Sequence, residues 1–216
     1  MSIRKTGVSL VVAVAMTACG GGGGSLGGGG TVPASGTAEG LWKGTTNTNR
    51  TIAGVVLDDG TYWFIYSSVG NSAVVAGAVQ GNGTSSGGAF SSSNGKDFNL
   101  EGLGVNNFTL AGSYTAKSSL GGTLTYAPSS TSTFTSTYNS NYELTPSLAT
   151  IAGTYSGSAA TSGGTESAVF TINGAGAISG SGASGCTFTG TASPRTKGNV
   201  YNLLRSRQVR RQLLFL

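Results

Sequence analysis

The sequence predicts an all-β protein built from antiparallel modules, each a small barrel or a sandwich, on three observations. Glycine, serine and threonine dominate the chain and charged residues make up only 9% of it, a composition that suits short strands and tight turns better than helices. Two-residue turn signals recur between apolar segments. Within those segments apolar and polar residues alternate with a period of two, as in strands that bury one face.

The first residues are typical of a secretory signal. Arg4 and Lys5 precede an uncharged apolar run, 7–15, and small residues then lead to Cys19. The run is far shorter than the roughly 20 apolar residues that span a bilayer. Residues 1–18 are therefore predicted to be a cleaved signal peptide.

The four residues Met16-Thr17-Ala18-Cys19 resemble the lipobox of bacterial lipoproteins, where a cysteine after a small-residue pair is acylated and becomes the mature N-terminus. Met16 stands where these families usually have leucine, a residue of similar bulk. The resemblance implies a lipid on Cys19 and, because Gly20 is not acidic, a location at the outer membrane. Several acyl chains would make this anchoring effectively permanent. An ordinary secreted protein with a chance cysteine is the alternative.

Residues 19–36 are mostly glycine and are expected to form a flexible tether, because such a chain cannot bury a core. The root-mean-square reach of such a coil from Cys19 to Gly36 is about 23 Å. The folded part would then be held near the membrane.

The formal charge of +5 does not describe the predicted β modules. Of the twelve basic residues, two lie in the signal and four in the last dozen positions, which leaves six against seven acidic residues. A nucleic-acid partner would need a basic face on the fold itself, so none is predicted.

The strongest hairpin signal is Asp59-Gly60, between the apolar segments Val55–Leu57 and Tyr62–Tyr66. A type I′ turn is predicted, in which both turn residues take positive φ. The sequence predicts similar turns at Asn82-Gly83, Asn94-Gly95, Gly121-Gly122 and Asn173-Gly174.

Several segments alternate clearly. Residues 108–114 place Phe108, Leu110 and Tyr114 on one face of a strand and Thr109, Ala111 and Ser113 on the other. A second strand buries Ala168, Phe170 and Ile172, and Leu124 with Tyr126 indicates a third, half-buried one.

The segment Tyr62–Tyr66 is apolar on both faces. Either the strand is covered on both sides, or its face of Tyr62, Phe64 and Tyr66 is open as a partner surface. A strand of the core is the favoured interpretation, because large aromatic side chains are mostly buried.

A weak internal repeat divides the chain after the tether. Gly40–Gly44 and Gly153–Gly157 each precede an apolar strand and a turn, so each is predicted to open a module. Between them, Ala127–Tyr142 is almost entirely serine, threonine and asparagine, and the boundary is placed near Pro146. The first module is then 37–146, and the second, 147–202, is too short to close.

Two further resemblances bear on fold. The spacing Gly40-Leu41-Trp42 resembles the opening of lipocalin-like and avidin-like barrels, in which the aromatic ring plugs one end of the barrel. The order of lipobox, glycine tether and β modules is similar to that of β-rich surface lipoproteins of Gram-negative bacteria, such as the transferrin-binding and factor H-binding types. No binding residue follows from this architectural likeness.

The sequence offers little for catalysis, and no catalytic, cofactor-binding or metal-ligating residue is predicted. The chain has no histidine, which excludes Ser-His-Asp and Cys-His arrangements. Matches to a nucleophile elbow at 83–87 and to a dinucleotide fingerprint at 180–185 lack the helix that each motif needs.

The acidic residues are given structural roles. Asp58 and Asp59 are interpreted as turn formers, and Asp97 and Glu101 as solvated charges at strand ends. A serine-lysine hydrolase that uses one of the lysines remains the enzymatic alternative, and its candidates are Lys43, Lys96 and Lys117.

The function favoured by these observations is that of a non-enzymatic, lipid-anchored envelope protein whose β module binds a partner. The partner would be an envelope or host protein at a sheet edge, or a small apolar ligand inside a barrel. A structural or assembly role at the outer membrane is the alternative.

The last residues, 203–216, differ from everything before them, with four arginines and five leucines and no glycine. One hypothesis is a basic amphipathic helix on anionic lipid. The other, which we favour, is a shift of reading frame that removes the rest of the second module. An unpaired Cys186 fits the second hypothesis, because a partner cysteine would be expected in an oxidising compartment.

Overall fold

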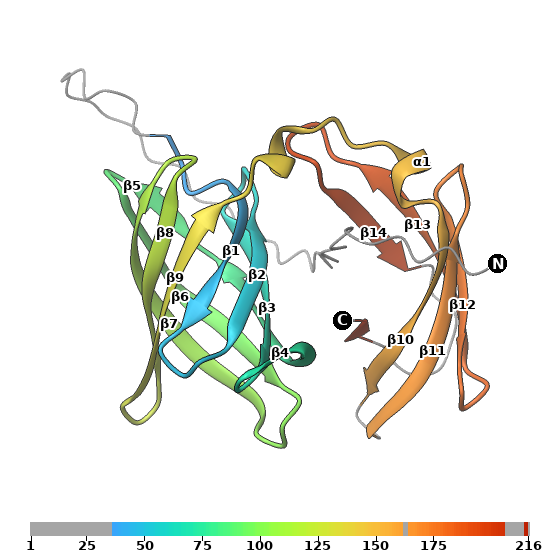
Figure 1. Cartoon of the computed structure of the whole chain (residues 1–216), viewed down its shortest axis with the longest axis horizontal. Coiled ribbons are helices and arrows are strands. Elements are labelled where there is room, and N and C mark those ends of the chain that lie inside the picture. Colours follow the sequence, from blue (N-terminus) through green and yellow to red (C-terminus); the bar gives the residue numbers. More distant parts are fainter. Residues whose placement is uncertain (1–35, 162–163, 206–213, 216) are drawn as a thin grey trace, which may run out of the picture.

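The computed structural model describes residues 36–161, 164–205 and 214–215. The described chain is all-β, as predicted, and consists of a closed antiparallel barrel of eight strands with one further short strand beside it, followed by a curled antiparallel sheet of five strands with a two-residue strand at its edge (Figure 1). The predicted signal peptide, Cys19 and most of the tether lie outside the described residues.

The barrel is an up-and-down meander in which each strand except β4 pairs with the next along the chain. Closure comes from β9, which pairs back to β1 with Trp42 opposite Tyr138, and from β4, which pairs directly with β6. The short β5 lies beside β6 beyond the end of β4. The strands are β1 (Gly40–Thr46), β2 (Thr51–Val56), β3 (Thr61–Ser68), β4 (Asn71–Asn82), β5 (Thr84–Ser86), β6 (Ala89–Asn99), β7 (Gly104–Thr115), β8 (Ser119–Tyr126) and β9 (Ser130–Tyr138).

One end of the barrel is closed by packed side chains. Trp42 is fully buried there, and its indole Nε1 donates to the carbonyl of Ala38 at 3.0 Å. Phe90 and Leu120 pack in the same cluster and are each 1% exposed. We call this the closed end; the opposite end, where the turns after β1, β3, β6 and β8 lie, is the open end.

The hairpin at Asp59-Gly60 is confirmed, but its type I′ turn is wrong. Leu57 N donates to the carbonyl of Thr61 at 2.8 Å and Gly60 N to that of Leu57 at 3.0 Å, so the loop has three residues. Gly60 alone of the three has positive φ, 81°. This is the bulged three-residue loop, and Asp59 acts as a turn former by accepting from Thr61 N at 2.9 Å.

Three other residue pairs that were predicted to form turns do not form hairpin turns. Asn94-Gly95 lies at a bulge inside β6, Gly121-Gly122 lies inside β8, and Asn82-Gly83 lies where β4 passes into β5. The reason is steric: a Cβ on Gly83 would overlap the ring of Phe90, and one on Gly95 the ring of Phe108. The predicted turn at Asn173-Gly174 does join two strands, β11 and β12.

The polar segment 127–142 contains a central strand, which its composition does not predict. Residues Ser130–Tyr138 form β9, which pairs with both β8 and β1 and closes the barrel. Ser136 is buried and Phe134 half-buried, while Thr133, Thr135 and Thr137 are exposed, so the strand alternates although nearly all its residues are polar. Threonine favours strands on an exposed face.

The second sheet begins after two short helices, η1 (Ser140–Glu143) and α1 (Leu148–Ile151), with Pro146 between them. Its order is β14-β13-β12-β11-β10-β15, all antiparallel. The strands are β10 (Gly153–Thr161), β11 (Gly164–Ile172), β12 (Ala177–Gly182), β13 (Thr187–Pro194), β14 (Tyr201–Arg205) and β15 (Leu214–Phe215). Its core contains Ile151, Ile172, Ala192 and Tyr201.

The first strands of the two sheets begin with the same local structure. Gly40 and Gly153 both have φ of 156°. Two residues later an aromatic side chain donates to the carbonyl four residues before it: Trp42 to Ala38 at 3.0 Å, and Tyr155 to Ile151 at 2.6 Å. The repeat seen in the sequence is therefore a repeat of local structure.

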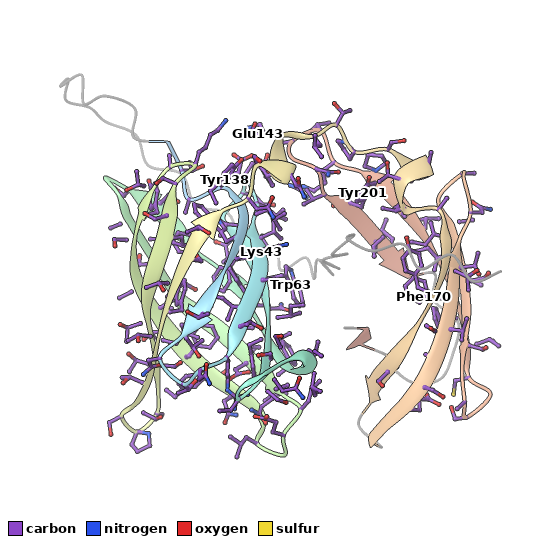
Figure 2. The ribbon with its side chains drawn as sticks, in the orientation of Figure 1. Lys43, Trp63, Tyr138, Glu143, Phe170 and Tyr201 are labelled. Carbon is purple, nitrogen blue, oxygen red and sulfur yellow. The ribbon has the colours of Figure 1, made fainter. Side chains whose placement is uncertain are left out.

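The two sheets contact one another beside the closed end. Trp63, on the outer face of β3, packs in a cluster with Tyr142 of η1 and Val200 of the β13–β14 loop, and Figure 2 shows it on the side of the barrel that faces the second sheet. Arg195 Nη2 reaches Asp58 Oδ1 at 2.7 Å across the same contact. Asp58 is thus an inter-sheet ion-pair partner as well as a turn residue.

The described part of the basic tail belongs to strands. Residues 203–205 complete β14 and 214–215 form β15. The predicted helix therefore does not begin at Leu203. Cys186 is half-buried between β12 and β13 and makes no disulfide within the described chain.

Candidate functional site: a cavity inside the barrel

A partly open cavity of about 480 Å³ lies inside the barrel, a volume within the range of small-molecule sites. It extends from the packed closed end to the open end, where residues of the β1–β2 and β6–β7 turns and of the start of β9 line it. Most of its wall is apolar. The aromatic lining residues are Tyr62, Phe64, Tyr66, Phe90, Phe108, Tyr126 and Phe134, and the aliphatic ones are Ile52, Val79, Leu103, Leu110, Leu120 and Leu124.

The aromatic rings can point inward because glycines face them on neighbouring strands. A Cβ on Gly81 would overlap the ring of Tyr62, and one on Gly77 that of Tyr66. Each ring therefore lies across a neighbouring backbone, and the space at the centre of the barrel stays open. These glycines, whose abundance suggested turns, instead allow an aromatic ring to lie directly against the backbone of a neighbouring strand.

One carboxylate lies inside this apolar wall. Asp97 of β6 is 8% exposed, and its two oxygens accept from the hydroxyls of Tyr66 at 2.8 Å and Tyr126 at 3.0 Å. Asn99 Nδ2 donates in turn to the Tyr66 hydroxyl at 3.2 Å. Four side chains from β3, β6 and β8 thus form a hydrogen-bonded group, which we call the Asp97 cluster: Asp97, Tyr66, Tyr126 and Asn99.

Burial sets the protonation of the Asp97 cluster. It raises the pKa of Asp97, and the hydrogen bonds from Tyr66 and Tyr126 oppose the rise only in part. Burial, with the nearby Asp97 charge, also raises the pKa values of Tyr66 and Tyr126. Both phenols therefore remain proton donors at neutral pH, and the carboxylate is the group that titrates.

An arginine, Arg50, lies at the open end of the barrel and forms an ion pair with Glu101. Arg50 Nη2 contacts Glu101 Oε2 at 2.7 Å, and Nη1 donates to the carbonyl of Ser67 at 2.9 Å. Its guanidinium carbon lies 5.4 Å from the centre of the Tyr66 ring. The Glu101 pairing raises the pKa of Arg50 and lowers that of Glu101, so both stay charged.

The prediction that Asp97 and Glu101 are solvated strand-end charges is wrong for Asp97. A bulge between Ser92 and Gly95 shifts the pairing of β6 with β7, so that Asp97 faces inward with Gly95. Glu101 lies at the rim in its ion pair, exposed, as predicted.

The three residues named as a partner surface face the interior. Tyr62 is 1% exposed and donates to Ser92 Oγ at 3.1 Å, and Phe64 and Tyr66 line the cavity. The other face of β3 is covered through Trp63 by Tyr142 and Val200. The strand is covered on both sides, and a partner reaches these rings only through the cavity.

The three lysines of the enzymatic alternative are outside the cavity. Lys43 is exposed on β1, Lys96 Nζ donates to Asn107 Oδ1 at 2.9 Å on the outer face, and Lys117 pairs with Glu143 at 2.9 Å. The described residues contain no group of three or more acidic or cysteine side chains that could hold a metal ion. No helix in the described chain is long and apolar enough to cross a membrane.

No protein-family model, no curated protein and no solved structure matches the chain.

Proposed function

We propose that this chain is a lipid-anchored envelope protein whose barrel binds a small, largely apolar ligand without chemical turnover. The observation that carries the proposal is the cavity of about 480 Å³. A small barrel can fill its interior with side chains, yet here seven aromatic rings surround open space. Apolar sites with a few placed polar groups are typical of ligand binding.

The envelope part of the proposal is supported by the secretory signal and by the resemblance of Met16–Cys19 to a lipobox. The absence of turnover is supported by a chain without histidine and by the position of the three candidate lysines outside the cavity.

The test uses the chain from Gly20 onward, which keeps every described residue and needs no detergent that could itself occupy the cavity. Titration with the neutral fluorophore N-phenyl-1-naphthylamine is expected to give saturable enhancement with one site per chain. Val79→Trp, which fills the cavity wall, should abolish it, whereas Thr109→Trp on the exposed face of β7 should not. A folded chain that gives no saturable signal would refute ligand binding.

A further inference from the structure

The position of Asp97 selects among the apolar ligands that the cavity could take. Of the residues lining the cavity, Asp97 is the one carboxylic acid. Its hydrogen-bond donors are two neutral phenols, and no lysine or arginine within the described residues forms a salt bridge with it. A carboxylate that is only 8% exposed and has no ion-pair partner is costly, because burial removes most of its hydration and no bound cation compensates for it.

The carboxylate also has unused acceptor capacity. Two carboxylate oxygens offer about four lone-pair sites, and the phenols of Tyr66 and Tyr126 occupy two. A ligand with several donor protons could use the others.

The surrounding rings favour a positive charge. Phe108 and Tyr126 lie with ring centres 5.6 Å apart, and Phe64 and Phe134 with centres 6.3 Å apart, all of them lining the cavity. The faces of such rings attract cations. The Arg50 guanidinium, 5.4 Å from the centre of the Tyr66 ring, already makes this contact at the rim.

A ligand carboxylate would meet the opposite conditions. It would approach the negative Asp97, and the one cation on the cavity wall, Arg50, is held by Glu101 at 2.7 Å and by the Ser67 carbonyl. A ligand without any polar group would leave Asp97 without a cation.

We propose that the cavity binds an apolar molecule that carries a protonated amine, with the ammonium group held by Asp97 between the Tyr66 and Tyr126 hydroxyls. This inference rests on the proposed ligand-binding function. The apolar part lies against the aromatic wall, and the ammonium supplies the charge and the donors that the carboxylate lacks.

The experiment compares three molecules of equal chain length, octylamine, octanol and octanoate, as competitors of bound N-phenyl-1-naphthylamine at pH 7. Octylamine is expected to displace the probe at a concentration at least about tenfold lower than octanol, which corresponds to about 1.4 kcal/mol. Octanoate is expected to be the weakest. Asp97→Asn should bring the displacing concentration of octylamine to that of octanol. Asp59→Asn changes an exposed acid at the closed end and should keep the difference between the two, so it is the matched control.

The outcomes separate this inference from the proposed function. Equal displacement by octanol and octylamine, or strongest displacement by octanoate, would overturn the amine while ligand binding stands. No probe binding by the unaltered chain would overturn both. If Asp97→Asn fails to fold, the ranking of the three competitors on the unaltered chain still tests whether the cavity prefers an amine. Tyr126→Phe, which removes one hydrogen-bond donor beside Asp97, then takes the place of Asp97→Asn as the variant.

Discussion

At the scale of single residues, Asp97 is the least expected feature of the barrel. It is 8% exposed and bonded to two phenols, in a wall that is otherwise mostly aromatic and aliphatic. A neutral side chain of similar shape would serve stability better at this position, because a buried charge without an ion-pair partner carries a desolvation cost.

The first prediction follows from this burial. Because burial raises the folded-state pKa of Asp97 above its unfolded value, the carboxyl contributes stability below the unfolded pKa and loses it as pH rises through the folded pKa. Asp97→Asn is therefore expected to have a higher Tm than the unaltered chain at pH 7, and the difference should shrink as pH falls toward about 4. Thermal unfolding followed by circular dichroism between pH 4 and 7 measures this.

In that comparison the groups facing Asp97 are Tyr66, Tyr126, Asn99 and the Arg50–Glu101 pair. The phenols do not titrate below pH 7, since their pKa values are raised. A Tm difference that grows as pH falls would contradict the prediction.

At the scale of strands, β6 shows where prediction from sequence ends. Counting by twos from Phe90 places Ser92, Lys96 and Phe98 on the inner face. The bulge between Ser92 and Gly95 reverses this parity, so Lys96 points outward and Asp97 inward. Local periodicity cannot show a bulge, because the unpaired residue is defined by the partner strand.

Other strands were predictable because nothing interrupts them. Phe108, Leu110 and Tyr114 are buried and Thr109, Ala111 and Ser113 exposed, as the alternation of β7 predicts. β9 was missed because its buried positions include serine, so that hydrophobicity alternates too weakly to be recognised. The cavity itself depends on glycines opposite rings in distant strands, a relation that no single segment contains.

The second prediction concerns β14, which pairs only with β13 among the described strands. Leu204 on this edge strand is 61% exposed, and unpaired apolar edges promote self-association. Leu204→Lys is expected to reduce aggregation, measured by light scattering during incubation at 37 °C. Val105→Lys changes an equally exposed residue, also 61%, on the barrel and should have a much smaller effect. If the two substitutions reduce aggregation equally, the added charge alone, and not the edge position of Leu204, would explain the reduction.

At the scale of the whole molecule, the third prediction concerns the anchor. If Cys19 is the acylated residue, Cys19→Ala is expected to leave an unprocessed precursor that takes up no label from a fatty-acid analogue. Gel mobility and the label report the two effects together. Retention of label by Cys19→Ala would place the anchor elsewhere, while the ligand-binding proposal for the barrel would stand unaffected.

The chain enters the barrel beside its closed end, where Ala38 N donates to Ser85 Oγ at 3.0 Å. The cavity opens at the other end, and strands such as β7, with 12 residues, make the barrel about 30 Å tall when tilted. A tether with a root-mean-square reach of about 23 Å is shorter than that height. If the tether is anchored in a bilayer through Cys19, this mean reach would place the closed end nearer to that bilayer than the mouth. Ligand would then enter from the aqueous side, and capture would depend on its dissolved concentration and not on its partition into that bilayer.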